Sequence, residues 1–289
     1  MSEPPISIVI AAPAACDALA ASFESARRQV EGAQLIVAGP AAAAERLAGF
    51  SGEFEVVEAD DAAPGELRNR ALARARAARV VVLDPGERLG EGALGRHLEA
   101  LAAEPHLVGS YGRTAVQEGG RTRVRPDHGK GGTLLRRLLK ERHLVASSAA
   151  LVWRRDALGA RPFGDYRSGQ ALRLALALDL ARGERELAFQ PEVVAQREAE
   201  AAELGTLEEL VRVLVGVVYG AEALDERIEL AARRRLARHL VAIGKHHYRE
   251  GAYARAGKFF DEAVKAAPAD FRGRRYQFLN FVKNTLTRE

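Results

Sequence analysis

Apolar runs rich in β-branched residues alternate with helix-forming segments along the first part of the chain. The runs are predicted as strands at residues 6–11, 34–38, 54–58 and 80–83. Helical patterns fall between them, at residues 18–30 and 42–47 and from about Glu66 onward. Strands that alternate with helices of about 10–15 residues indicate right-handed βαβ units and a parallel sheet. The chain is therefore predicted to begin with an α/β domain.

The middle of the chain adds strands of a different kind. Two apolar stretches, 107–116 and 121–124, flank Glu118-Gly119-Gly120 and predict a β-hairpin. A basic helix is expected at 134–142, a strand ending at Trp153, a helix at 170–180 and another strand at 187–197. From Gly205 onward the pattern is helical only. Two domains are predicted, an α/β domain over 1–200 and an all-α domain over 201–289.

The helical part contains one repeat-like signature at about 237–270. Small and aromatic residues there have the spacing of a single tetratricopeptide unit, namely Gly244, Gly251, Tyr253, Ala256, Phe260, Ala263 and Pro268. One unit cannot bury both of its faces, so it should pack on helices at 206–220, 225–238 and 274–286. Three roles stay open for residues 205–289: covering a sheet edge, forming a dimer, and binding a protein partner.

Composition narrows the function classes. The 289 residues are 47% hydrophobic and 28% charged with a net charge of +4, which is typical of a globular protein and too balanced for a nucleic-acid binder. One cysteine, Cys16, excludes a disulfide framework and a multi-cysteine zinc site. No stretch approaches the roughly 20 apolar residues of a membrane span, and no signal-peptide pattern opens the chain. We therefore expect a cytoplasmic protein.

Two carboxylates stand where an α/β sheet binds ligands. Asp84 follows the strand at 80–83 directly, and Glu87 comes three residues later. Ligands of open α/β sheets bind beyond the carboxyl ends of the strands, and carboxylate oxygens suit magnesium or manganese. Asp-Pro-Gly is also a preferred turn sequence. The segment is thus either a metal site or a turn.

Gly65, Arg68, Asn69, Leu83 and Asp84 together resemble a motif of family-2 glycosyltransferases, which have the GT-A fold. In that family Gly-x-x-x-Arg-Asn opens a helix, and the next strand ends in Leu-Asp-x-Asp-Asp. Gly86 and Glu87 occupy the places of the two later aspartates.

The resemblance extends over residues 5 to about 198 and implies a nucleotide-sugar donor. It implies that Arg68, Asn69 and Asp84 contact the nucleotide, and that Asp84 and Glu87 hold Mn²⁺ or Mg²⁺.

The chain departs from the family pattern at the other expected acids. The second strand ends in Ala38-Gly39-Pro40-Ala41, without the aspartate that contacts the base. The acidic pair that supplies the general base would fall at Ser168-Gly169-Gln170, and Asp165 is the nearest substitute. Two functions follow: transfer of a sugar to a glycan, lipid or protein acceptor, or a catalytically degenerate scaffold that binds a glycan, a nucleotide or a protein partner.

Residues 121–142 carry eight Lys or Arg against two acidic residues. By resemblance this is the acceptor-side loop. A basic loop there would meet an acidic glycan, a lipid-linked phosphate or the headgroups of a membrane, which would make the protein membrane-peripheral. The alternative is an ordinary solvated, arginine-rich face.

Overall fold

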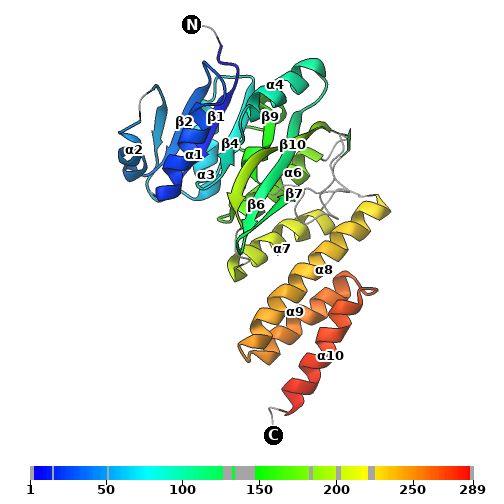
Figure 1. Cartoon of the computed structure of the whole chain (residues 1–289). Helices are drawn as coiled ribbons and strands as arrows, with labels where there is room; N and C mark the ends of the chain where they lie inside the picture. Colours follow the sequence, from blue (N-terminus) through cyan, green and yellow to red (C-terminus); the bar gives the residue numbers. More distant parts are fainter. Residues whose placement is uncertain are drawn as a thin grey trace. The chain divides into compact units, whose positions relative to one another are not determined.

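The computed structural model describes residues 3–14, 16–50, 52–125, 132–133, 147–181, 185–199, 203–220 and 225–286. The chain forms two compact units, Met1–Glu200 and Ala201–Glu289 (Figure 1). Most of the basic segment 121–142 lies outside the described residues, and so does the helix expected at 134–142.

Parallel strands linked by helices form the first half of the sheet in the N-terminal unit. Neighbours pair in the order β3-β2-β1-β4, with every pair parallel. The strands are β1 (Ser7–Ala11), β2 (Gln34–Gly39), β3 (Glu55–Glu58) and β4 (Arg79–Leu83). The helices that connect them are α1 (Asp17–Arg27), α2 (Ala41–Leu47) and α3 (Pro64–Arg74). The βαβ alternation expected from the sequence is confirmed.

Beyond β4 the sheet becomes mixed. β9 (Leu151–Arg154) is antiparallel to β4 and also to β6 (Gly109–Glu118), and β10 (Glu186–Glu198) runs parallel to β6. β7 (Arg121–Arg125) forms the expected hairpin with β6. Two short strands pair with β10, namely β5 (Arg88–Leu89) and β8 (Gly132–Thr133). The sequence pattern did not predict β5.

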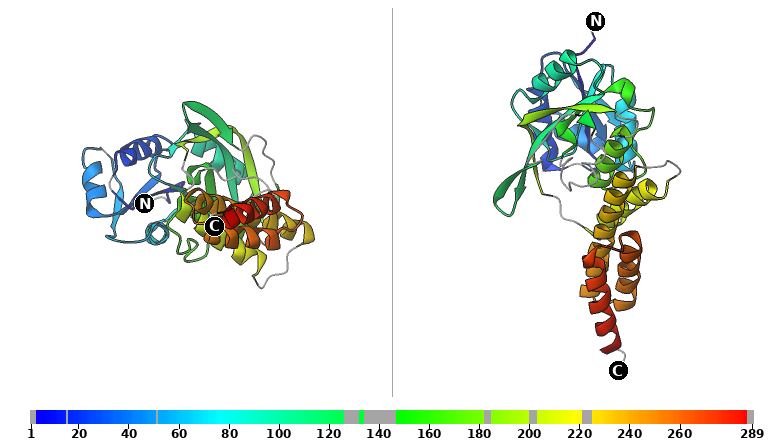
Figure 2. Two further views of the ribbon diagram at one scale, coloured as in Figure 1. Left: turned by 90° about the horizontal axis from the view of Figure 1, so that it is seen from below. Right: turned by 90° about the vertical axis from the view of Figure 1, so that its right-hand side faces the viewer.

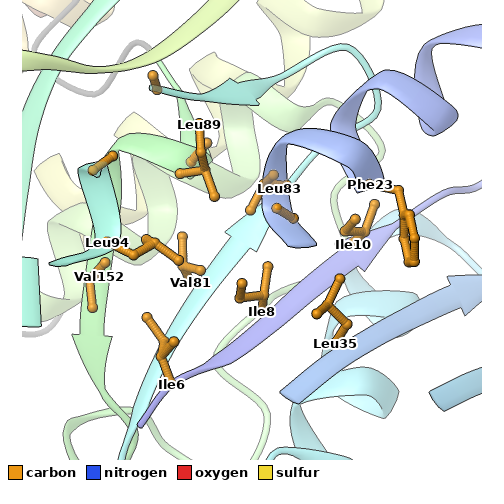
Figure 3. Packing of buried hydrophobic residues seen from close by; sticks show 14 of the residues in the cluster. Ile6, Ile8, Ile10, Phe23, Leu35, Val81, Leu83, Leu89, Leu94 and Val152 are labelled. Atoms are coloured by element: carbon orange, nitrogen blue, oxygen red, sulfur yellow. The ribbon is translucent and has the colours of Figure 1, made fainter. Parts of the chain in front are cut away.

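Helices complete this unit, and buried side chains from both sequence halves meet between them and the sheet. Ile8 and Ile10 of β1 lie beside Val81 and Leu83 of β4 (Figure 3). They pack under Phe23 of α1 and under α4 (Ala93–Ala103), a helix that the sequence pattern did not predict. Alternate residues of each strand point to opposite faces, and α3 packs on β1 and β2. The helix α6 (Gly169–Ala181) was expected at 170–180.

The C-terminal unit consists of helices in its described residues, and successive helices pack on one another (Figure 2). These are α7 (Leu204–Val218), α8 (Glu226–Arg249), α9 (Tyr253–Ala266) and α10 (Phe271–Leu286). The helix boundary expected near Arg238 was wrong, because α8 runs on without interruption. A Cβ atom at Gly244 would come within 2.5 Å of the Phe260 ring, so glycine permits the close packing of α8 and α9. The tetratricopeptide identity of this pair stays a prediction.

The helices of the described ranges do not meet the requirements of a membrane span. None of them combines enough length with enough apolar character to cross a bilayer.

His97 on α4 is fully buried, and we predict that it makes stability depend on pH. Its Nδ1 lies 2.8 Å from Ser110 Oγ, and desolvation lowers its pKa from 6.5 to about 3. Between pH 6.5 and a pH of about 3, His97 is therefore protonated in the unfolded chain but not in the folded chain. The free energy of unfolding should fall as the pH drops below 6.5, by up to about 1.4 kcal/mol per pH unit.

Urea denaturation at a series of pH values measures this slope. His97→Gln should flatten it, whereas His106→Gln should leave it unchanged, because the side chain of His106 is exposed. Equal slopes in the wild type and His97→Gln would contradict the prediction.

Candidate functional site

The segment after β4 is a β-turn. The Glu87 amide donates to the Asp84 carbonyl at 2.9 Å, and Gly86 has a φ of +93°. Pro85 in the second position and a glycine with positive φ in the third are the features of a type II turn. The Gly86 amide donates to Ser22 Oγ at 2.9 Å, which ties the turn to α1. The interpretation of this segment as a turn is confirmed, and the turn also folds the Glu87 side chain back toward Asp84.

The Glu87 carboxylate is buried in a socket of backbone amides. It accepts hydrogen bonds from the amides of Asp84 at 3.0 Å, Ser148 at 3.0 Å and Ala149 at 3.1 Å. Ser148 and Ala149 belong to a single 3₁₀ turn, Ser148–Ala150, that leads into β9. A buried carboxylate with several amide donors is well compensated for the loss of water. Glu87 therefore joins the β4 turn to the beginning of β9.

Guanidinium groups from three distant elements surround the two carboxylates. Arg68 of α3 pairs with Asp84, and Arg173 Nη1 of α6 lies 2.9 Å from the other Asp84 oxygen. Arg173 and Arg197 of β10 each place an Nη1 3.7 Å from Glu87 Oε1. We call these five residues, Arg68, Asp84, Glu87, Arg173 and Arg197, the ion cluster. Asp84 is its least buried member, with 15% of its side chain exposed.

Burial and charge act in opposite directions on the two acids. Desolvation by itself would raise the pKa of Asp84, but the charges of Arg68 and Arg173 together outweigh it and hold that pKa below the usual range. Desolvation raises the pKa of Glu87, and the neighbouring Asp84 charge raises it further against the pull of Arg173 and Arg197. The ion cluster thus brings three guanidiniums together with two carboxylates.

Asn69 positions a loop. Its amide donates to the Phe163 carbonyl at 2.8 Å and accepts from the Phe163 amide at 3.1 Å. The Phe163 ring lies under the Arg68 guanidinium, 5.7 Å from its centre. Both polar atoms of the Asn69 side chain thus hold the backbone of Phe163, and the contact between Asn69 and a nucleotide stays a prediction.

The structure places Asp165 at the edge of this region. A Cβ atom at Gly65 would come within 2.2 Å of the Gly164 carbonyl, so α3 and the loop of Asp165 are in close contact. Asp165 is exposed, two residues beyond the Phe163 that Asn69 holds. Arg68 and Asp84 are brought together, and Asp165 lies on the loop that packs against α3.

Gly169 takes the place of an acid of the family pattern and leaves little room for one. A Cβ atom there would lie 3.0 Å from Asp84 Oδ2 and 3.1 Å from Arg173 Nη1. A longer acidic side chain would have to displace this ion pair. The glycine and the ion cluster therefore fit each other.

Sequence reasoning missed Arg173 as a member of the site. Arg173 interrupts the apolar run 171–178 of α6 and is itself 5% exposed. An isolated charge on an apolar helix predicts a buried partner of opposite charge. The sequence carried that signal but did not identify the partner.

The carboxylates do not fit a divalent cation. Both Glu87 oxygens accept hydrogen bonds from backbone amides, and both Asp84 oxygens pair with guanidiniums. Mn²⁺ and Mg²⁺ need oxygen ligands that face the ion, and three guanidiniums would repel it. Nor do three or more His, Cys, Asp or Glu side chains gather as a metal site anywhere in the described ranges.

Comparison with known proteins identifies the fold. No protein-family model and no curated protein sequence matches this chain. Its structure is similar to that of S. aureus TarS 1–349, a glycosyltransferase, with a TM-score of 0.62 and 13% identity, over 98% of this chain and 91% of that one.

The complex of TarS 1–349 with UDP-GlcNAc is equally similar, with a TM-score of 0.62 and 14% identity over the same shares of the two chains. The full TarS structure gives 0.57 and 14%, over 96% of this chain and 54% of that one. The GT-A fold expected from the sequence is confirmed, since this likeness covers nearly the whole chain.

Glu87→Ala should destabilise the protein strongly. The change removes the acceptor of three buried amides and leaves two buried guanidiniums with less compensation, which costs roughly 3–5 kcal/mol. Urea unfolding followed by circular dichroism measures the loss.

Glu66→Ala is the matched control, because Glu66 pairs with Arg70 and Arg161 at the surface and such pairs contribute at most about 1 kcal/mol. If Glu87→Ala does not fold, Glu87→Gln tests the same point, since it keeps the shape and loses the charge. Equal losses at Glu66 and Glu87 would show that the ion cluster does not stabilise the fold.

Proposed function

We propose that this chain is a glycosyltransferase-like scaffold that binds the diphosphate of a nucleotide sugar beside the ion cluster, without a divalent cation and without transferring the sugar. The observation that carries the proposal is that the protein itself uses both carboxylates, Asp84 and Glu87. Each is bonded to amides or guanidiniums of this chain. Arginines would then neutralise the charge of the diphosphate in place of a metal ion.

Position and charge favour a diphosphate. The ion cluster lies where β4 ends, which is the edge of an open α/β sheet that binds ligands. Its three guanidiniums attract phosphate oxygens, and guanidinium recognises phosphate better than ammonium does. TarS, which has the same fold, has been crystallised with UDP and with UDP-GlcNAc. A nucleotide sugar is therefore the ligand class to test first.

We infer that the chain does not transfer the sugar, because the acidic pair that would supply the general base is missing. Ser168-Gly169-Gln170, where the resemblance expects the acidic pair, contains no acid, and the ion pair of Asp84 and Arg173 lies beside Gly169. General-base catalysis contributes about 10²–10⁴-fold to a rate, so a site without a base would be nearly inactive.

Calorimetric titration with UDP, UDP-GlcNAc, GDP and dTDP tests the binding proposal, each ligand with EDTA and then with manganese. We expect at least one nucleotide to bind equally well in both buffers. Arg68→Ala should weaken binding by about 10- to 100-fold, the usual contribution of a charge-assisted bond. Arg70→Ala is the matched control, because Arg70 lies two residues along α3 and pairs with Glu66.

Two results would contradict the proposal. If no nucleotide binds, the donor site is lost. If binding needs manganese and disappears in Glu87→Gln, the metal site of the family is intact and the ion cluster rearranges to form it.

Active transfer is the second candidate, favoured by the placement of Asp165. Asn69, Phe163 and Gly65 hold the loop of Asp165 against α3, close to Arg68. An exposed carboxylate there would accept the proton of an acceptor hydroxyl on a glycan, a lipid-linked group or a protein.

Release of UDP from UDP-GlcNAc, measured with and without added acceptors, decides between the two candidates. If transfer occurs, Asp165→Asn should lower the rate about 10²–10⁴-fold while nucleotide binding is unchanged. A background rate that is the same in both proteins would rule out Asp165 as the base.

A further inference from the structure

The last helix, α10, packs through one face and leaves the opposite face without a partner among the described residues. Tyr276 stacks on Phe260, with ring centres 5.6 Å apart, and the Asn280 amide donates to the Tyr253 carbonyl at 3.0 Å. Phe271, Phe278 and Val282 are spaced by seven and four residues and so share a face. At 100° per residue that face points away from Tyr276 and Asn280.

The unpartnered face exposes large aromatic side chains. Phe271 is 74% exposed, Phe278 66% and Phe281 68%, and Val282 is 39% exposed. Contiguous exposed apolar side chains of this kind mark an interaction site on a folded protein. Phe278 and Phe281 also line a groove of about 490 Å³, together with residues that include Asp261, Gln277 and Asn284. We call Phe271, Phe278 and Phe281 the ridge of phenylalanines, and it provides most of the exposed apolar surface of α10.

The same helix is basic throughout. Arg272, Arg274, Arg275 and Lys283 are exposed on it, and residues 271–286 contain no acidic residue. Asp270 accepts the Arg272 amide at the helix start, and Asp261 accepts a hydrogen bond from Gln277. The exposed phenylalanines of α10 thus share their helix with four exposed cationic side chains.

Charge decides which occupant fits this face. A symmetric contact between two copies would bring eight cationic side chains together, and like charges at an interface oppose association. An anionic surface would be attracted instead. Phenylalanine has no polar atom, so its burial favours hydrocarbon over the hydrated backbone of a soluble polyanion. Exposed phenylalanines bind acyl chains, and Arg and Lys beside them on the same helix bind anionic headgroups.

We propose that α10 binds the surface of an anionic lipid bilayer, with Phe271, Phe278 and Phe281 inserted among the acyl chains and the four cationic residues on lipid headgroups. The helix lies in the interface and does not cross the bilayer. This proposal does not rest on the nucleotide site proposed for the other unit.

Co-sedimentation of the full chain with phosphatidylserine–phosphatidylcholine vesicles and with phosphatidylcholine vesicles tests the proposal. We expect binding to the anionic vesicles at least tenfold tighter than to the neutral ones, and weaker at high salt. Phe271→Ser with Phe278→Ser should reduce this binding by at least tenfold. Arg272→Gln with Arg275→Gln should reduce it as well.

The matched control is Val215→Ser with Leu230→Ser. Val215 and Leu230 are 40% and 45% exposed and lie on α7 and α8 of the same unit, so this variant should bind as the wild type does. Circular dichroism checks that every variant is folded. Phe278→Trp adds a direct measure of insertion, since its fluorescence should shift to the blue only with anionic vesicles.

Three outcomes would overturn the proposal. One is equal binding to neutral and anionic vesicles, or binding to neither. Another is binding to vesicles and to soluble polyphosphate that the phenylalanine changes leave intact, which would show a site for polyanions. The third is a dimer in analytical ultracentrifugation that the phenylalanine changes abolish, which would assign the face to a second copy.

Discussion

The buried carboxylate of Glu87 joins segments that are far apart in the chain. Its oxygens accept hydrogen bonds from amides of the β4 turn and of the 3₁₀ turn before β9. They also lie near guanidiniums of α6 and β10. Removing a charge of this kind from water is costly, so the fold has to provide all of these partners together. The parallel half of the sheet and its mixed half are thus connected at the carboxyl end of β4.

This constraint has a direct consequence for chemistry. A carboxylate that holds the backbone in place is not available to hold a metal ion, and Asp84 is similarly occupied by Arg68 and Arg173. The family pattern uses acids at these positions for the donor. Here the same positions stabilise the fold, and the three guanidiniums are what a diphosphate would meet. Glycine at position 169 fits this change, because any side chain there would crowd the ion pair.

The two units differ in how they treat exposed apolar surface. In the N-terminal unit the aliphatic residues of β1, β2 and β4 are covered by α1 and α4. In the C-terminal unit the described helices pack in succession, and the last one keeps three exposed phenylalanines. Burying such side chains lowers the free energy of the system by about 25 cal/mol for each Å² removed from water. The three phenylalanines are not buried within their own unit, so they can be buried against a partner.

The sequence by itself determined the βαβ alternation, the hairpin of β6 and β7, the helical C-terminal unit and the likeness to GT-A glycosyltransferases. These follow from local periodicity, turn residues and short motifs, which act over a few neighbouring positions. The motif also located Arg68 and Asp84 at one site. It did not identify α4, where Gly92 at the N-cap and Gly95 within the helix weaken the helical pattern.

Only the tertiary structure decided what the acids do. Arg173 is 89 residues from Asp84, and the Ser148 amide is 61 residues from the Glu87 carboxylate that it binds. No local pattern specifies contacts over such separations, because they depend on how the strands are ordered in the sheet. The sequence therefore left Asp84-Pro85-Gly86-Glu87 open as a turn or a metal site. The fold made it a turn whose acids are bound by the protein's own amides and arginines.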